Sequence, residues 1–99
     1  MTCSIIITTT DSIEVADTIS NQLIQDAFAK CIWRDEVKST YLWEGKLVSS
    51  KEYRLFIKSN KGYFRKICDK IKEMHNYDVP AIIEIDIKGE ENFINWLKG

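Results

Sequence analysis

The hydrophobic pattern of this 99-residue chain predicts an α+β fold with the element order β-α-β-β-α-β and a short helix at the C-terminus. Runs rich in β-branched residues at 3–10 and 81–88 are typical of strands. Apolar residues recur at helical spacing over 13–30 and 63–75, which indicates two amphipathic helices. Between these helices, residues 31–59 follow the period of two expected for a long pair of strands.

The first strand and helix have the clearest local signals. Ile5, Ile6 and Ile7 are consecutive and β-branched, as expected of a central strand that is covered on at least one face. Asp11 and Ser12 are predicted to cap the first helix, and Asp11 followed by Glu14 resembles a capping box. The helix is predicted to run from Ile13 to about Lys30.

The segment 31–59 is predicted to form a long hairpin that turns at Glu44 and Gly45. Neither face of its first arm, 31–43, is apolar throughout, which predicts a bulge or a change of partner. In the second arm, 46–59, the polar residues 49–51 predict a bend. At about 3.3 Å per residue each arm reaches about 40 Å. Because this outruns a small sheet, we expect the surplus to pair with another chain.

The second half of the chain continues with a helix at 63–75, a loop at 76–80 and a strand at 81–88. Pro80 cannot donate a ladder hydrogen bond and therefore marks the start of that strand. Its alternation places three residues on one predicted buried face: Ile83, Ile85 and Ile87. With a last helix at 92–98, these elements predict one domain, residues 1–99, with the ferredoxin-like βαββαβ arrangement, a long hairpin between the second and third strands and a short C-terminal helix.

Composition excludes several classes of function. Fourteen basic residues balance fifteen acidic ones, so no basic field attracts nucleic acid or an anionic membrane. No apolar run approaches the roughly 18 residues of a membrane-spanning helix, and no leader is recognised, which predicts a cytoplasmic protein. Cys3, Cys31 and Cys68 are odd in number and widely spaced, so we expect buried, reduced thiols.

Two motifs resemble a known family. The runs Tyr-Leu-Trp-Glu-Gly-Lys at 41–46 and His-Asn-Tyr-Asp-Val-Pro at 75–80 are, at this separation, similar to those of the CutA family of divalent-cation tolerance proteins. The likeness extends over nearly the whole chain, including residues 29–31, 57–59 and 96–97. It implies a ferredoxin-like subunit, a tight homotrimer and a link to divalent metals, copper above all.

The resemblance also implies site residues. Some CutA proteins bind copper through a Cys at the end of the first strand and two adjacent His, and the matching positions here are Thr8, Met74 and His75. His75 is therefore the predicted metal ligand, in a weak site for Cu²⁺ or another divalent cation, because copper selectivity needs several N or S ligands. The implied intersubunit cleft, which would hold a metal or a small anion, is lined by six residues: Tyr41, Trp43, Lys46, Glu52, Lys58 and Tyr77.

Catalysis is not expected. The chain has one His and no glycine-rich phosphate loop. The neighbouring carboxylates of Asp35 and Glu36 point to opposite faces of a strand and cannot act as a pair. The sequence therefore predicts a CutA-like homotrimer that takes part in divalent-cation tolerance, copper included. The alternative is a small-molecule-sensing or scaffold trimer without a physiological metal site.

Overall fold

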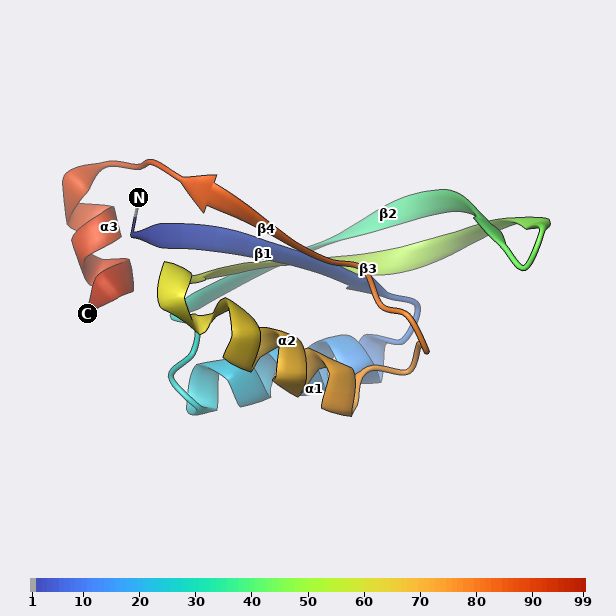
Figure 1. Ribbon diagram of the computed structural model, residues 1–99, viewed down its shortest axis with the longest axis horizontal. Helices are drawn as coiled ribbons and strands as arrows, with labels where there is room; N and C mark the ends of the chain where they lie inside the picture. The colour runs from blue at the N-terminus through green and yellow to red at the C-terminus, as the bar shows by residue number, and fades with distance from the viewer. Residues whose placement is uncertain (1) are drawn as a thin grey trace.

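The computed structural model describes residues 2–99 and has the predicted order of elements (Figure 1). The elements are β1 (Cys3–Thr10), α1 (Ile13–Gln25), β2 (Cys31–Trp43), β3 (Lys46–Asn60), the short 3-10 turn η1 (Lys61–Tyr63), α2 (Phe64–Met74), β4 (Ile82–Ile87) and α3 (Glu91–Lys98). The predicted α+β class with a long hairpin and a C-terminal helix is confirmed.

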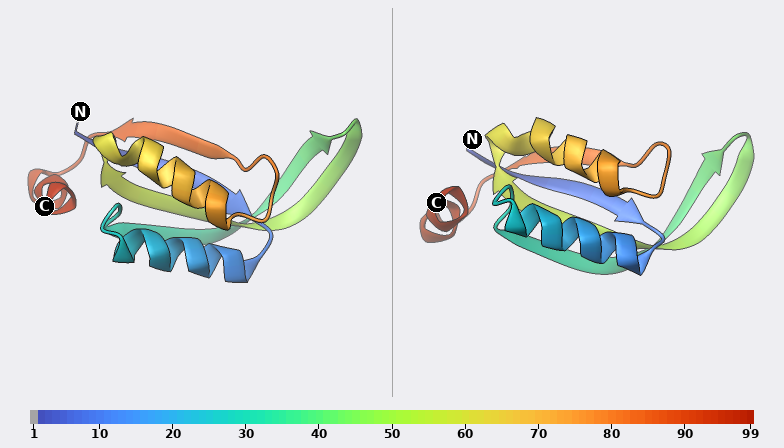
Figure 2. Two further views of the ribbon diagram at one scale, coloured as in Figure 1. Left: turned by 60° about the horizontal axis from the view of Figure 1, so that its bottom comes forward. Right: turned by 90° about the horizontal axis from the view of Figure 1, so that it is seen from below.

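The four strands form one antiparallel sheet in the order β2-β3-β1-β4. Helices α1 and α2 lie side by side on one face of this sheet, and α3 lies at one end of it (Figures 1 and 2). The β2-β3 hairpin runs far past the end of β1, which gives the subunit dimensions of 45 × 23 × 21 Å.

The hairpin ladder is unbroken from the pair Cys31 and Lys58 to the pair Trp43 and Lys46. The predicted bulge in β2 and the predicted bend at residues 49–51 are therefore wrong. The outer half of the hairpin projects beyond both helices, so neither of its faces has to be apolar to cover the core of its own subunit. The mixed apolar and polar pattern of β2 is explained by that position, because the pairing with β3 is continuous.

The core fills the space between the sheet and the two long helices. Ile6, Leu55 and Ile57 come from the central strands and are fully buried. They pack with Ile19 of α1 and Ile67 of α2, on the apolar stripes predicted for these helices. The helices in residues 2–99 are all too short or too polar to cross a lipid bilayer.

Helix α1 begins at Ile13 as predicted but ends earlier than predicted. Of the two predicted cap residues, Asp11 and Ser12, the N-cap is Ser12, whose Oγ accepts a hydrogen bond from the Val15 N–H at 3.2 Å. The helix ends at Gln25, five residues earlier than expected, because Ala27 adopts a left-handed conformation with φ of 61°. The Phe28 N–H then donates to the Leu23 carbonyl at 3.1 Å, which closes the helix as a Schellman motif.

The residues of β4 alternate as predicted, but Ile83, Ile85 and Ile87 face away from α1 and α2, whereas Ile82 packs against the core. Ile83 and Ile85 are 52% and 49% exposed, on the sheet face that α1 and α2 do not cover. Glu84 lies opposite Ile6 in the register, on the helix-covered face, where its Oε2 accepts from the Ser4 Oγ at 2.9 Å. We call the uncovered surface the open face; its other large apolar members are Ile5, Ile7, Trp33 and Phe56.

The three cysteines are free thiols, as expected, but only Cys3 is buried. Cys31 and Cys68 are half-buried: Cys31 lies on the edge strand β2, and Cys68 follows the buried Ile67 in α2. Partial burial raises the pKa of the Cys68 thiol.

Candidate functional site

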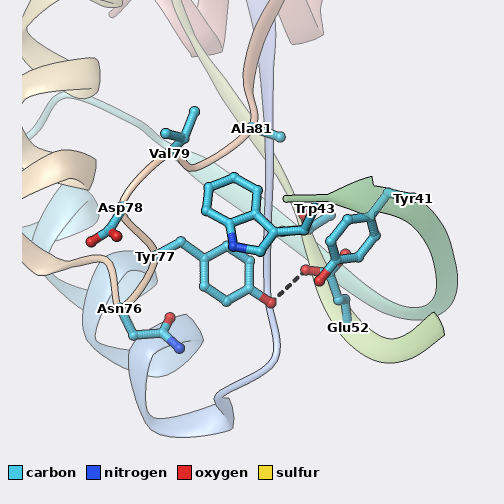
Figure 3. Close-up of a pocket in the computed structure, with 9 residues that line it drawn as sticks. Tyr41, Trp43, Glu52, Asn76, Tyr77, Asp78, Val79 and Ala81 are labelled. Carbon is cyan, nitrogen blue, oxygen red and sulfur yellow. Dashed lines mark hydrogen bonds between the residues drawn. The ribbon is translucent and has the colours of Figure 1, made fainter. Parts of the chain in front are cut away.

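A cavity of about 380 Å³ lies where the hairpin leaves the body of the subunit (Figure 3). Its walls come from β1, from the β2-β3 hairpin and from the loop that follows α2. The lining residues are Thr9, Tyr41, Trp43, Glu52, Asn76, Tyr77, Asp78, Val79 and Ala81.

His75 holds the loop in place. Its backbone is extended (φ −75°, ψ 147°), so α2 ends at Met74 and the chain turns toward β1. The Tyr77 N–H donates to His75 Nδ1 at 3.0 Å, so Nε2 carries the ring proton and donates to the Thr9 carbonyl at 2.8 Å. Both ring nitrogens of the neutral imidazole are thus occupied, and Tyr77 is fixed beneath the hairpin.

Tyr77 and Glu52 form the polar centre of the cavity. The Tyr77 hydroxyl donates to Glu52 Oε2 at 2.6 Å (Figure 3). Burial and the hydrogen bond to the Glu52 carboxylate raise the pKa of Tyr77, which keeps its hydroxyl protonated as a donor. Glu52 is only 4% exposed. No Lys, Arg or His in the part of the chain described by the structure forms an ion pair with it.

Four of the six predicted cleft residues line this cavity: Tyr41, Trp43, Glu52 and Tyr77. The two lysines do not. Lys46 is exposed beside the hairpin turn. Lys58 is buried near the other end of β3, with its Nζ 2.7 Å from the centroid of the Trp33 ring and 3.6 Å from the Cys31 Sγ.

The cavity therefore has an acidic lining without a basic residue, since its charged lining residues are Glu52 from the hairpin and Asp78 from the loop. Sequence reasoning missed Thr9, Asn76, Asp78, Val79 and Ala81. Three of them belong to the His-Asn-Tyr-Asp-Val-Pro run itself, so the motif was a usable signal for them. Thr9 carried no signal of its own.

The three positions that match the family's copper ligands do not form a donor set. Thr8 is fully buried on the helix-covered face, between Leu55 and Ile82 in the register, and its hydroxyl has no partner in residues 2–99. Met74 packs against the core. A metal ion on His75 would have to replace one of its two hydrogen bonds. Residues 2–99 also contain no group of three His, Cys, Asp or Glu side chains able to hold a metal. The residues thus do not fit a preformed copper centre, and His75 as a ligand stays a prediction.

Fold and cavity together define a ferredoxin-like α+β subunit with an overlong hairpin and a cavity lined by aromatic and acidic residues. The family model for the CutA1 divalent ion tolerance protein matches residues 4–99. The chain belongs to the CutA family, and the resemblance of its two motifs to that family is confirmed. The family is named for tolerance of divalent cations and not for a catalysed reaction.

Relatives of known name agree with this assignment. The "Divalent-cation tolerance protein CutA" of Pyrococcus horikoshii is 34% identical over 94 residues, which cover 94% of this chain and 92% of the relative. The structure of the "Periplasmic divalent cation tolerance protein CutA" from Archaeoglobus fulgidus matches with a TM-score of 0.93 and 31% identity, covering 96% of this chain and 94% of the other. "Protein CutA, chloroplastic" of Arabidopsis thaliana is 31% identical over 86% of this chain but only 48% of its own length.

These names overturn the prediction of a cytoplasmic protein. The same domain occurs in a protein described as periplasmic and in one described as chloroplastic. Location is set by targeting segments that are separable from the fold, so the composition of the domain does not determine it.

Proposed function

We propose that this chain, as a single-domain subunit of residues 1–99, forms a homotrimer that acts in divalent-cation tolerance, copper included, without catalysing a reaction. Its ligand site is the cavity between hairpin and loop, at a cleft between subunits. The observation that carries the proposal is the open face of the sheet, where large apolar side chains stay exposed because α1 and α2 pack on the other face.

The open face and the hairpin support assembly together. Trp33, Ile83 and Ile85 are each about half exposed or more. Large uncovered apolar surfaces on small domains mark interaction sites. The outer hairpin adds unpaired strand edge beyond the body, where Leu42 and Leu47 are also exposed. A closed symmetric assembly covers such surfaces in every subunit at once, and family resemblance favours three subunits.

The role of the metal has two forms. In the first, a divalent cation such as Cu²⁺ binds at the cleft through His75. In the second, the trimer senses a small molecule or serves as a scaffold, and its connection with metals is indirect. One observation favours the second: both nitrogens of His75 already hold the loop that shapes the cavity.

Two measurements test the proposal. Sedimentation and light scattering at micromolar concentration should give about three times the subunit mass of 11.6 kDa. The apo protein is then titrated with Cu(II) and Zn(II), alongside His75→Ala. Binding that is lost in the variant supports the first form, whereas no binding below about 1 mM supports the second. A monomer at all concentrations contradicts both forms.

A further inference from the structure

We propose that the cavity binds an organic ammonium ion, a small molecule whose charged amine carries alkyl groups. Glu52 supplies the counter-charge, and the rings of Tyr41, Trp43 and Tyr77 supply the apolar wall (Figure 3). The inference rests on the proposed function only in taking this cavity as the ligand site. All four residues come from one chain.

The first observation is a buried carboxylate that lacks a counter-ion. Glu52 is 4% exposed, and its one hydrogen-bond partner among the described side chains is the neutral Tyr77 hydroxyl. Burial of a carboxylate is costly unless a cation or several donors compensate it. A phenol is neutral when protonated, so the Tyr77 hydroxyl donates to Glu52 but adds no positive charge. A cationic ligand would supply the counter-charge that the Glu52 carboxylate lacks in this chain.

The second observation concerns the aromatic rings. Seven other rings of residues 2–99 have a Lys or Arg side chain over them: Phe28, Trp33, Tyr53, Phe56, Tyr63, Phe93 and Trp96. Tyr41, Trp43 and Tyr77 have none in that same part of the chain. One face of the Tyr77 ring packs against the His75 ring, with centroids 4.8 Å apart. Three electron-rich rings without a protein cation thus line the same cavity as the uncompensated carboxylate.

The same lining disfavours other ligand classes. A small anion would meet Glu52 and Asp78 and find no Lys, Arg or His in the wall. A hard divalent cation needs six or so oxygen ligands, whereas much of this wall is aromatic or aliphatic. Rings together with a carboxylate are the arrangement that recognises alkylated ammonium groups. The volume of about 380 Å³ is in the range of small-molecule sites.

The test compares a charged probe with its neutral isostere. Choline carries a trimethylammonium group, and 3,3-dimethylbutan-1-ol has the same shape with carbon in place of nitrogen. Isothermal titration of the full-length protein should show choline binding at least about tenfold more tightly than the alcohol, the difference expected of a desolvated cation–π and carboxylate site.

Three variants localise the binding. Glu52→Gln keeps the size of the side chain and removes its charge, and Trp43→Leu removes one ring; each should weaken choline binding by about tenfold or more. Trp96→Leu is the matched control, because Trp96 is 48% exposed against 46% for Trp43 but lies on α3 at the opposite end of the molecule. Its affinity for choline should equal that of the wild type.

Several outcomes would overturn the inference. These are equal affinities for choline and the alcohol, binding that survives both Glu52→Gln and Trp43→Leu, or no binding of choline up to about 10 mM. The last outcome includes the case in which a lysine of a neighbouring subunit fills the cavity.

Sedimentation of the same samples separates the two proposals. A trimer without choline binding contradicts only this inference, and a monomer that binds choline contradicts only the proposed assembly.

Discussion

Replacement of Ile85 by aspartate is expected to dissociate the assembly while leaving the subunit folded. Ile85 lies in β4 on the open face and is 49% exposed in the isolated subunit. The core lies on the other side of the sheet, between Ile6 and the two long helices. A charge at position 85 therefore remains hydrated in the monomer and loses its water only when another subunit covers the open face.

The size of the effect follows from the exposed area. Complete burial of an isoleucine side chain is worth about 1.5–3 kcal/mol, so covering the exposed half contributes about 0.7–1.5 kcal/mol in each subunit. A trimer contains the residue three times, which gives about 2–4 kcal/mol and raises the dissociation constant about 30- to 1000-fold. Desolvation of the three carboxylates adds several kcal/mol for each ion.

Sedimentation velocity over a dilution series measures this change, with circular dichroism as the check on folding. Ile13→Asp is the matched control: Ile13 is 43% exposed but begins α1, on the opposite face of the sheet. An acidic residue there also suits the helix N-terminus, so the subunit should remain as stable as the wild type. If Ile85→Asp stays assembled over the same dilutions as Ile13→Asp, the open face is not an interface and the reasoning from its exposure fails.

Two further predictions concern the subunit alone. Ala27→Gly should raise the free energy of unfolding by about 0.5–1 kcal/mol, because glycine adopts the φ of 61° at the end of α1 without strain; urea denaturation measures this, and Ala29→Gly, a change at a buried residue without positive φ, should be destabilising. Tyr77→Phe should cost about 1.5–3 kcal/mol near pH 8, where the hydroxyl donates to Glu52. Because folding raises the pKa of Tyr77, its contribution is complete below the ordinary pKa of about 10 and is lost as the pH rises further. Unfolding curves at pH 8 and at about pH 11 should therefore show a smaller alkaline loss of stability in the variant, and equal losses would contradict the assigned hydrogen bond.

The order of the elements could be predicted from the sequence because the apolar residues of each strand and helix recur at the spacing of that element. The end of α1 could not be predicted, because the residue in the left-handed position is Ala27 and not glycine. The motif is recognisable only from the hydrogen bond between the Phe28 N–H and the Leu23 carbonyl. The capping box predicted at Asp11 does not form, for a similar reason. Asp11 has the right chemistry, but its carboxylate accepts from the Asn76 Nδ2 at 2.8 Å, a contact that local sequence does not encode.

The candidate site was predictable in part. Tyr41 and Trp43 stood out as paired aromatic residues, and the resemblance added Glu52 and Tyr77. The resemblance also grouped Lys58 with them. Glu52 and Lys58 do share one face of β3, but at about 3.3 Å per residue they lie about 20 Å apart along the strand. Alternation identifies the face that a side chain occupies, and the distance along the strand decides whether it can reach a cavity.

The isoleucines of β4 show why an interface is harder to recognise than a core. Strict alternation divides a strand into an apolar and a polar side, yet the pattern is the same whether the apolar side meets a helix or another subunit. In β4 the covered side carries Glu84, whose charge is accommodated by the Ser4 hydroxyl, while Ile83 and Ile85 face outward. Only the pairing of Glu84 with Ile6 in the register shows which side is already covered. An apolar stripe on the sheet face opposite the core cannot be buried by the helices that cover the core. Its exposure is the physical reason for expecting a partner on that face.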